Sequence, residues 1–560
     1  MIKKITASVG CCLMFVAGTI AQTEYSNYNQ QTARLDALGK NYPQSVKLKS
    51  ITKTTGGKDI WMLTIGSGNT AMKPGIAVVG GVEGNHLLGT ELAIGFAEKL
   101  MQGSATDSIK NLLDRTTFYV FPNMSSDAME QYFAALKYER QGNANQTDDD
   151  RDGKVNEDGY DDLDRNGKIT LMRIESPVGD YRINPEDNRS LVKADMAKGE
   201  KGKYLLMAEG IDNDKDGHFN EDGEGGVWFN KNLSFNHPSF TRGSGEFPVS
   251  ENETRALLDN LFQLFNVYAV VSFSTNNNLS TPFIFNSANA TSRIVSGWLE
   301  PDIKVNSMVS DMYNKSANMK EAPKVSPAGG DLLSWGYFHY GRFSFSTPGW
   351  FVPKAVADTS RKAGVDSTKK IDTVKKEKPF VVEDAAANYF RWAGRQGISP
   401  AFTEWKKIEH PDFPGQNVEV GGIDPFVLIN PPFKMVAEIT AKHTAFLINL
   451  AALQPEVDIV NIKTEKIGGG ISRITASVIN KGALPSHSKL GERTYWVKRI
   501  NVKLNVSNNQ SIISGKKIQL LNSLEGYSTK ELSWLVKGSG TVVLEAGSPT
   551  TGSRKVEISL

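Results

Sequence analysis

The sequence predicts an α/β fold, in which helices flank a mixed sheet, followed by a β-sandwich. Two observations predict it. Up to about residue 450, apolar runs such as Thr117–Phe121 and Val267–Phe273 alternate with helix-like segments such as residues 90–101, a pattern typical of helices packed on a buried mixed sheet. After residue 455, runs such as residues 472–479 alternate in polarity and are separated by turn residues, which predicts antiparallel strands packed as a sandwich.

The chain's length and N-terminus indicate a multidomain exported protein. With 560 residues and 39% hydrophobic residues, it exceeds one ordinary domain. Residues 1–21 carry two lysines ahead of an apolar stretch ending in Gly-Thr-Ile-Ala, which predicts a secretory signal peptide. We therefore expect a first domain at residues 22–455 and an immunoglobulin-like sandwich at residues 456–560. A lipoprotein interpretation of Cys11 is disfavoured, because the apolar run mostly follows this cysteine.

Composition excludes several kinds of site and partner. Both cysteines lie within the predicted signal peptide, so the mature chain would have neither disulfides nor thiolate metal sites. The net charge of +2 gives no reason to expect nucleic acid or an anionic membrane as a partner. No later segment approaches the roughly 20 apolar residues of a transmembrane helix. We expect a periplasmic or secreted protein.

Aspartate-rich repeats interrupt the first domain. Residues 148–159 are echoed by residues 212–223, and residues 162–167 form a shorter third copy. Carboxylates at alternate positions followed by glycine suit a calcium ion, although Gly159, Arg173 and Gly223 stand where an EF-hand has a bidentate Glu. A solvated acidic loop is the alternative, but close carboxylates without a cation would repel one another. The expected calcium ligands are Asp148, Asp150, Asp152, Asn156, Asp158, Asp162, Asp164, Asn166, Asp212, Asp214, Asp216, Asn220 and Asp222.

Two insertions are expected in the first domain. One spans about residues 146–226 and contains these repeats, which calcium would order. The other spans about residues 355–378, where Lys, Asp, Ser and Thr dominate and apolar residues are scarce, a composition typical of an exposed flexible loop.

A possible metal site follows the apolar run at residues 76–79. Residues 80–86 read Gly-Gly-Val-Glu-Gly-Asn-His, a glycine-rich turn that carries Glu83 and His86. Both side chains are zinc-competent ligand types, and ligands on such sheets usually bind beyond the strand ends.

Several motifs occur in the order found in the zinc carboxypeptidase family, which the chain resembles from about residue 25 to residue 454. They are the turn at residues 80–86, Phe-Pro-Asn at 121–123 with Asp127, the segments 225–232 and 272–275, and the segment from Gly329 to Trp350. The resemblance implies a carboxypeptidase-like fold, a zinc ion and removal of C-terminal residues from peptides. The family turn, however, reads Gly-Gly-x-His-x-x-Glu, so Glu83 and His86 stand in reversed order.

The resemblance also implies that the catalytic positions are substituted. The zinc-equivalent positions are Glu83, His86 and Ser274, and a hydroxyl is a poor zinc ligand beside imidazole. The general-base position is Pro348, which accepts no proton; Glu404, within Phe-Thr-Glu-Trp, is an outside candidate. The pair that grips a substrate carboxylate becomes Asn230 and Lys231, which keeps the charge without the guanidinium fork. Zinc binding is therefore doubtful.

Three functions follow from these observations. The favoured one is a degenerate carboxypeptidase that binds a peptide C-terminus or a glycan, or acts as a scaffold. The second is an active metallocarboxypeptidase with a non-standard zinc site, for which His237 is the nearest additional ligand; His339, His410 and His443 are expected in packing, turn or surface roles. The third is an adhesion protein whose working part is the sandwich.

Overall fold

The computed structural model describes residues 22, 24–149, 151–223, 225–323, 325, 327–354 and 385–560. The predicted signal peptide (1–21), the expected ligand Asp150 and the predicted flexible insertion (355–378) lie outside the described residues.

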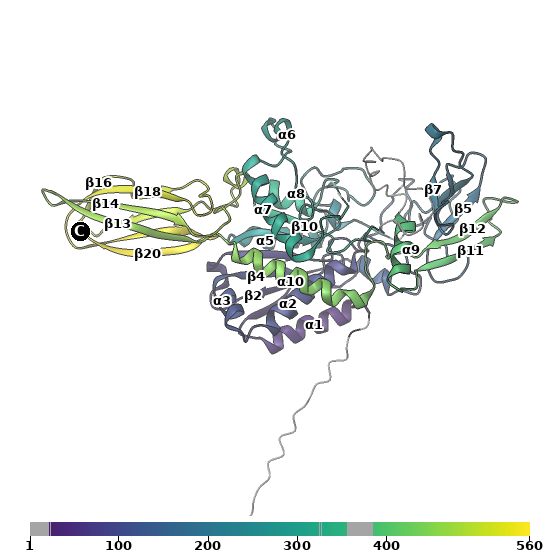
Figure 1. The fold of residues 1–560 in the computed structure, drawn as a ribbon, viewed down its shortest axis with the longest axis horizontal. Coiled ribbons are helices and arrows are strands. Elements are labelled where there is room, and N and C mark those ends of the chain that lie inside the picture. The colour runs from purple at the N-terminus through teal and green to yellow at the C-terminus, as the bar shows by residue number, and fades with distance from the viewer. Residues whose placement is uncertain are drawn as a thin grey trace, which may run out of the picture.

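A mixed six-stranded sheet forms the centre of the molecule, as predicted (Figure 1). Its order is β1 (Val46–Lys53), β2 (Asp59–Ile65), β4 (Thr117–Phe121), β3 (Gly75–Val79), β9 (Val267–Phe273) and β10 (Phe343–Thr347). Strands β4, β3, β9 and β10 pair in parallel, and the β1–β2 hairpin joins them antiparallel through β2. Because β3 lies between β4 and β9, the connections diverge at its end, and the loops beyond it are where such sheets bind ligands.

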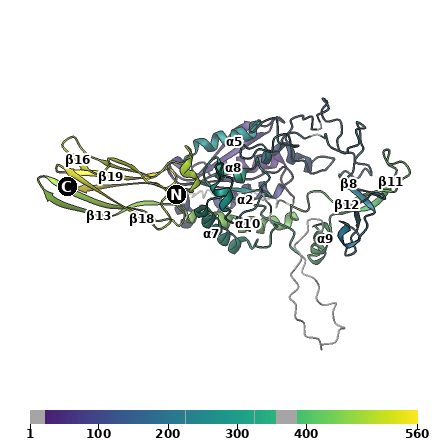
Figure 2. The same cartoon turned by 90° about the horizontal axis from the view of Figure 1, so that it is seen from above.

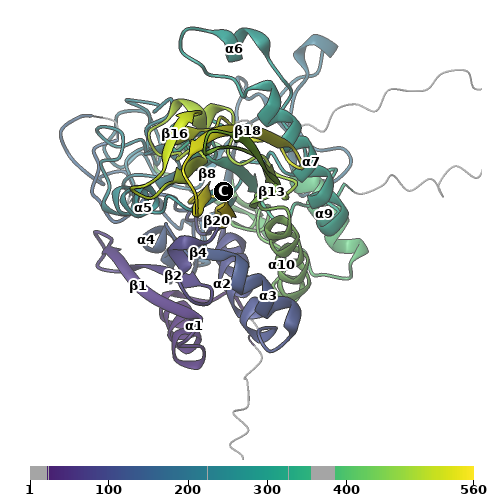
Figure 3. The ribbon, with the colours of Figure 1, turned by 90° about the vertical axis from the view of Figure 1, so that its left-hand side faces the viewer.

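Helices cover both faces of this sheet because the side chains of its buried strands alternate in direction. Ile76 and Val78 pack in one apolar cluster, whereas Ala77 and Val79 pack in another. The first cluster contains residues of α1 (Tyr28–Asn41), α2 (Leu87–Gln102), α3 (Asp107–Arg115), α7 (Glu300–Ala317), α9 (Ala385–Arg395) and α10 (Val436–Ala452). The second contains residues of α5 (Asn252–Gln263) and α8 (Leu332–Phe338). In Figure 3, α1, α2, α3 and α10 lie below the end of the sandwich.

A second six-stranded sheet was not predicted from the sequence. Its order is β11 (Phe402–Ile408), β12 (Val418–Ile423), β5 (Leu171–Glu175), β8 (Tyr204–Ala208), β6 (Tyr181–Ile183) and β7 (Leu191–Lys193). Strand β12 pairs antiparallel with β5, so the insertion that contains the repeats is joined to a segment more than two hundred residues further along the chain. A small core of Met172, Ile174, Val418 and Val420 holds the two segments together.

The C-terminal region folds as two four-stranded antiparallel sheets around one apolar core, which confirms the predicted fold class. One sheet contains β13 (Val457–Gly468), β14 (Ile471–Asn480), β18 (Thr529–Lys537) and β16 (Ser511–Ser514), and the other contains β17 (Ile518–Leu520), β15 (Asn501–Asn505), β19 (Thr541–Ser548) and β20 (Gly552–Ser559). Trp534 is the largest buried side chain of this core.

The molecule is elongated. Figure 2 shows the sandwich at one end, the helix-covered sheet in the middle and the second sheet at the other end. The remaining short helices are α4 (Ser126–Met129), beside the central sheet, and α6 (Ser287–Thr291), which protrudes in Figure 1. Within the described part of the chain, no helix combines the length and apolar character needed to cross a membrane.

Candidate functional site

The turn after β3 requires its glycines. Gly81 has a φ of +56°, and a Cβ there would lie 2.4 Å from the Asn123 side-chain oxygen. A Cβ on Gly84 would lie 2.3 Å from the Ala128 Cβ. The backbone therefore passes closer to its neighbours than any side chain would permit. This approach delivers Glu83 and His86 to the sheet edge, and α2 begins immediately afterwards.

Glu83 lies at the centre of a hydrogen-bonded cluster beyond the strand ends. Its carboxylate accepts from the Ser274 hydroxyl at 2.6 Å and from the Asn230 amide at 2.7 Å. Thr275 donates to it from its hydroxyl at 3.1 Å and from its backbone N–H at 3.3 Å. Ser274 follows β9 directly, so the parallel strands bring together side chains that are 191 residues apart.

His86 contacts the position that the resemblance assigns to the general base. Its Nε2 lies 3.0 Å from the carbonyl oxygen of Pro348, which follows β10. A carbonyl can only accept, so Nε2 carries the proton. The Nδ1 atom lies 4.0 Å from the Glu83 carboxylate and makes no hydrogen bond within the described residues. All four positions equivalent to zinc ligands and general base are therefore neighbours.

Burial sets the charge of this cluster. His86 is fully buried, and burial lowers its pKa to about 4, so the imidazole is neutral at physiological pH. Burial also raises the pKa of Glu83, while the donors from Ser274, Thr275 and Asn230 act in the opposite direction. Since these donors suit an anion, they stabilise the charged carboxylate without any metal ion.

The donor set does not fit a catalytic zinc ion. Such a site needs three good ligands and an open position for water. Here Ser274 donates to Glu83, both Glu83 oxygens already accept hydrogen bonds, and His86 offers only Nδ1. Within the described residues, the groups of three or more metal-competent side chains all lie among residues 152–216, none of them at this site.

Asn230 and Lys231 have different surroundings. Asn230 donates to Glu83 and accepts from the backbone N–H of Leu332 at 2.9 Å, so both ends of its amide hold the turn and α8 together. The Lys231 ammonium lies 3.9 Å from the Trp228 ring centroid and donates to the Arg242 carbonyl at 3.1 Å. Burial lowers the pKa of Lys231. The structure therefore leaves Lys231, and not Asn230, as the donor available to an anion.

Glu404 does not belong to the site. It lies exposed on β11 of the second sheet, not on the central sheet whose strand ends carry Glu83 and Pro348. The outside candidate for the general base is therefore wrong, because its Phe-Thr-Glu motif is an edge-strand sequence.

The four other histidines considered from the sequence make contacts elsewhere. His237 contacts the Ser239 hydroxyl and the Ser244 carbonyl, so its recruitment as a zinc ligand finds no support. His339 bonds to the Ser234 hydroxyl and His410 to the Gly210 carbonyl. His443 bonds to the Tyr313 hydroxyl and to the Ile439 carbonyl.

The two long aspartate-rich repeats cap each other. Asp158 of the first repeat accepts the backbone N–H groups of Asn213 and Asn220 in the second. Asp222 of the second accepts those of Asp149, at 3.3 Å, and Asn156, at 3.1 Å, in the first. Asp158 and Asp222 are almost completely buried and pair as a β-bridge. These two predicted calcium ligands therefore join the repeats directly.

The other predicted ligands shape their own loops. The first aspartate of each loop accepts from the backbone N–H of that loop's glycine, at 3.0, 3.1 and 2.7 Å for Asp148, Asp212 and Asp162. Asp152, Asp164, Asn166 and Asp216 accept from backbone N–H groups two residues further on. Asp214 does the same for Asp216. The side-chain oxygens of Asn156 and Asn220 are buried and make no hydrogen bond within the described residues.

Three groups of carboxylates have oxygens within 4.8 Å of one another, namely Asp152–Glu157–Asp214, Asp162–Asp164–Glu209 and Asp212–Asp214–Asp216. Glu157 and Glu209 were not among the predicted ligands. Burial raises the pKa of Glu209 to about 7, as expected for a carboxylate whose charge is poorly compensated. The sequence signal that could have revealed it is a lone Glu between the apolar run of β8 and the second repeat.

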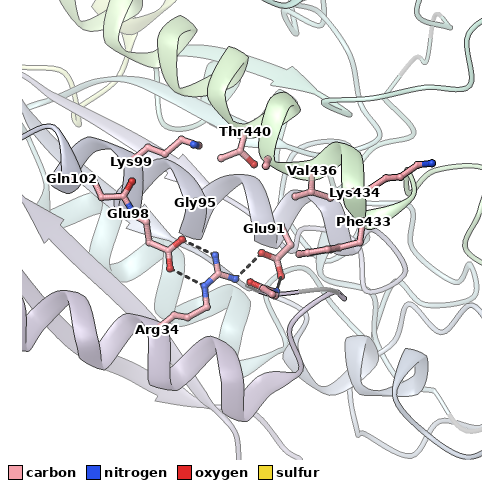
Figure 4. A pocket seen from close by; sticks show the side chains of 12 residues that line it. Arg34, Glu91, Gly95, Glu98, Lys99, Gln102, Phe433, Lys434, Val436 and Thr440 are labelled. Carbon is pink, nitrogen blue, oxygen red and sulfur yellow. Dashed lines mark hydrogen bonds and ion pairs between the residues drawn. The ribbon is translucent and has the colours of Figure 1, made fainter. Parts of the chain in front are cut away.

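A surface pocket on the helical side is a packing feature (Figure 4). The guanidinium of Arg34, on α1, bonds to two carboxylates of α2, Glu91 at 2.6 Å and Glu98 at 2.8 Å. The single positive charge of Arg34 is shared between these two carboxylates and compensates one of their two negative charges, and Lys99 and Lys434 also line the pocket.

Comparisons with known proteins agree with the order of motifs. A family model described as "Zinc carboxypeptidase" matches residues 32–348, and one described as a domain of unknown function matches residues 456–559. Carboxypeptidase D of Anas platyrhynchos is 29% identical over 136 residues, which are 23% of this chain and 10% of that protein. Carboxypeptidase E of Caenorhabditis elegans is 28% identical over 175 residues, 29% of this chain and 35% of that protein. The chain thus spans a minor part of these relatives.

Solved structures give a weaker likeness. Bovine thrombin-activatable fibrinolysis inhibitor, in complex with tick carboxypeptidase inhibitor, aligns with 58% of this chain and 86% of its own at 12% identity and a TM-score of 0.35. Carboxypeptidase A from Helicoverpa armigera aligns with 58% of this chain and 64% of its own, also at 12% identity and a TM-score of 0.35.

Proposed function

The chain belongs to the zinc carboxypeptidase family, and we propose that it is an exported, non-hydrolytic member that binds peptide C-termini. The Glu83 carboxylate at its zinc-equivalent site already accepts hydrogen bonds from Ser274, Asn230 and Thr275. The occupied carboxylate of Glu83 is the observation that carries the proposal.

Chemistry supports the absence of hydrolysis. Peptide hydrolysis by zinc needs a metal-bound water and a base to accept its proton. Pro348 stands at the base position and its carbonyl is bonded to His86. Loss of general-base catalysis alone lowers a rate by roughly a hundredfold to ten-thousandfold. Loss of the third ligand at Ser274 removes the acidified water as well.

Lys231 is the proposed contact for the ligand's carboxylate. Its ammonium lies over the Trp228 ring, next in the chain to Asn230, and an ammonium attracts a carboxylate as a point charge without a fixed geometry. Such a site would prefer a free C-terminus over an amidated one and would discriminate little between terminal side chains. A scaffold role follows if peptide binding recruits other proteins to the cell envelope.

We also propose that the aspartate-rich insertion binds calcium as a structural ion. The alternating carboxylates and the groups of oxygens within 4.8 Å support a hard cation. Zinc would prefer imidazole or thiolate ligands, and none of these groups contains one.

Metal analysis of the purified mature protein tests both parts of the proposal. After exposure to zinc and calcium, elemental mass spectrometry is expected to find calcium without stoichiometric zinc, and carboxypeptidase assays are expected to show no hydrolysis. Stoichiometric zinc that disappears in a Glu83→Ala, His86→Ala double variant, together with peptide hydrolysis, would instead establish an active enzyme with a non-standard site.

Peptide binding is tested by calorimetric titration with peptides of varied C-termini and with their amidated forms. We expect weak binding of free C-termini that is lost in Lys231→Met and retained in a control, Lys434→Met, in which the lysine is exposed on the helical side. Equal binding of amidated peptides, or binding of glycans alone, would contradict this part of the proposal. N-terminal sequencing of the exported protein is expected to begin near Gln22.

A further inference from the structure

The strongest unexplained polar atom outside the zinc-equivalent site belongs to Glu209. This residue follows β8 directly and its side chain has no exposed surface. One carboxylate oxygen accepts from the Thr170 hydroxyl at 3.1 Å. The other, Oε1, is buried and makes no hydrogen bond within the described residues. A buried carboxylate oxygen without a partner is costly, so it calls for a ligand.

Two further carboxylates face the same point. Oxygens of Asp162, Asp164 and Glu209 all lie within 4.8 Å of one another. Within the described residues, none of the three makes an ion pair with Lys or Arg; the Lys406 ammonium reaches only the Asp164 backbone carbonyl, at 3.5 Å. Three carboxylates so close together repel one another unless a cation lies between them.

We infer that Asp162 and Asp164 of the short repeat, together with Glu209, form a site for one divalent cation of the calcium type. The ligands are oxygens only, as calcium prefers, and two of the three come from an irregular loop that can adapt to a large coordination sphere. Backbone N–H groups of Asn166 and Gly167 hold the Asp162 carboxylate, at 2.9 and 2.7 Å, and fix the loop around it.

This assignment gives the short repeat the acidic ligand that it lacks in the sequence. Its own twelfth position is Arg173, which instead bonds to Glu419 across the second sheet. Glu209 lies in the adjacent strand segment and is joined backbone to backbone to Thr170 at 3.1 Å. The closing carboxylate is therefore supplied from 45 residues beyond Asp164 by the pairing of β5 and β8.

The cation would fasten the second sheet to the central domain. Gly167 and Ile169 form backbone hydrogen bonds with Lys137, which follows α4 in the chain, while Glu209 directly follows β8 of the second sheet. Lys168 adds an ion pair of 2.5 Å to Asp424, just after β12. Occupation of the site would thus link the loop, the segment after β8 and the segment at Lys137. This inference deepens the proposed calcium-binding insertion and rests on it.

The test compares calcium stoichiometry and affinity in the full mature protein and its variants. In calorimetric titration with Ca²⁺ alone, Glu209→Gln is expected to bind one ion fewer than the wild type, or to bind one ion at least tenfold more weakly. Asp164→Asn is expected to lose the same ion, and because Asp164 is only half-buried it also serves if Glu209→Gln does not fold. Glu404→Gln, on the same sheet but exposed, is the control and is expected to bind like the wild type.

The outcomes separate this inference from the broader proposal. If the wild type binds no calcium, the calcium-binding insertion itself is refuted. If the wild type binds calcium and both Glu209→Gln and Asp164→Asn retain every ion with unchanged affinity, the insertion binds calcium but this site does not. Titration with Mg²⁺ should give weaker binding; a site that takes Mg²⁺ more tightly than Ca²⁺ would overturn the assignment of ion type.

Discussion

Replacing Glu83 by Ala should destabilise the protein strongly, because the carboxylate is a structural acceptor. The substitution leaves the donors on Ser274, Asn230 and Thr275 without their acceptor. Hydrogen bonds to a charged group contribute about 1.5–3 kcal/mol each. Removing the carboxylate also relieves its own cost of burial, which raises its pKa. We therefore expect a net loss of about 2–4 kcal/mol, well below the sum of the bonds.

Urea unfolding followed by fluorescence and circular dichroism measures this loss. Glu83→Gln keeps the shape and one acceptor oxygen, but its NH₂ group would face the donors of Ser274, Asn230 and Thr275. Its unfolding free energy should therefore lie between those of the wild type and Glu83→Ala. Glu98→Ala is a suitable control, because it removes a partly exposed ion pair with Arg34 that is worth about 1 kcal/mol or less. If Glu83→Ala were as stable as this control and its zinc content fell instead, Glu83 would be a metal ligand and our reasoning would fail.

Four further predictions concern other parts of the molecule. His443→Leu should reduce the dependence of the unfolding free energy on pH between pH 6.5 and 4. Burial lowers the pKa of His443 to about 4, so the unfolded chain binds more protons in this range, and up to about 3 kcal/mol of the unfolding free energy present above pH 6.5 is lost on acidification. An unchanged pH profile of unfolding would contradict this. Asp158→Ala should make the insertion at residues 146–226 sensitive to limited proteolysis, with roughly 2–4 kcal/mol lost locally, whereas resistance equal to the wild type would show that the capping is dispensable. Gly81→Ala should lower stability by about 2 kcal/mol or more through strain at positive φ and overlap with Asn123, and a neutral effect in thermal unfolding would mean that the turn can relax. Trp534→Ala should cost about 3–5 kcal/mol in the sandwich while peptide binding at Lys231 persists; loss of both together would show that the sandwich supports the site.

The family resemblance grouped Glu83, His86, Ser274 and Pro348, and these four residues are neighbours in the structure; Thr275, which also bonds to Glu83, was not predicted. Glu83, Ser274 and Pro348 meet because each lies beyond the end of a parallel strand, and β3, β9 and β10 end at the same edge of the sheet. The hydrogen-bonding roles were not predictable, because a Ser that donates to a carboxylate and a Ser that ligates a metal look identical in sequence. The orientation of Asn230 also depends on the backbone N–H of Leu332, a contact between segments 102 residues apart.

The second sheet and its cation ligands could not be predicted for a different reason. Strands β5 and β12 are short, and their neighbours in the sheet come from distant parts of the chain, as the pairing of β5 with β12 shows. Glu209 carries no repeat motif of its own, and its approach to Asp162 follows from the β5–β8 pairing, which local pattern does not reveal.

Because Asp158 and Asp222 each accept hydrogen bonds from the other repeat, neither repeat can complete its hydrogen bonds until both have been synthesised. The backbone N–H groups of Asp149 and Asn156 must wait for an acceptor that is synthesised 73 and 66 residues later. The hydrogen bonds of Asp148 and Asp152 within the first repeat do not depend on Asp222, but these two backbone N–H groups do. The two repeats therefore fold as one unit, and deleting either would leave backbone N–H groups of the other without their carboxylate acceptor.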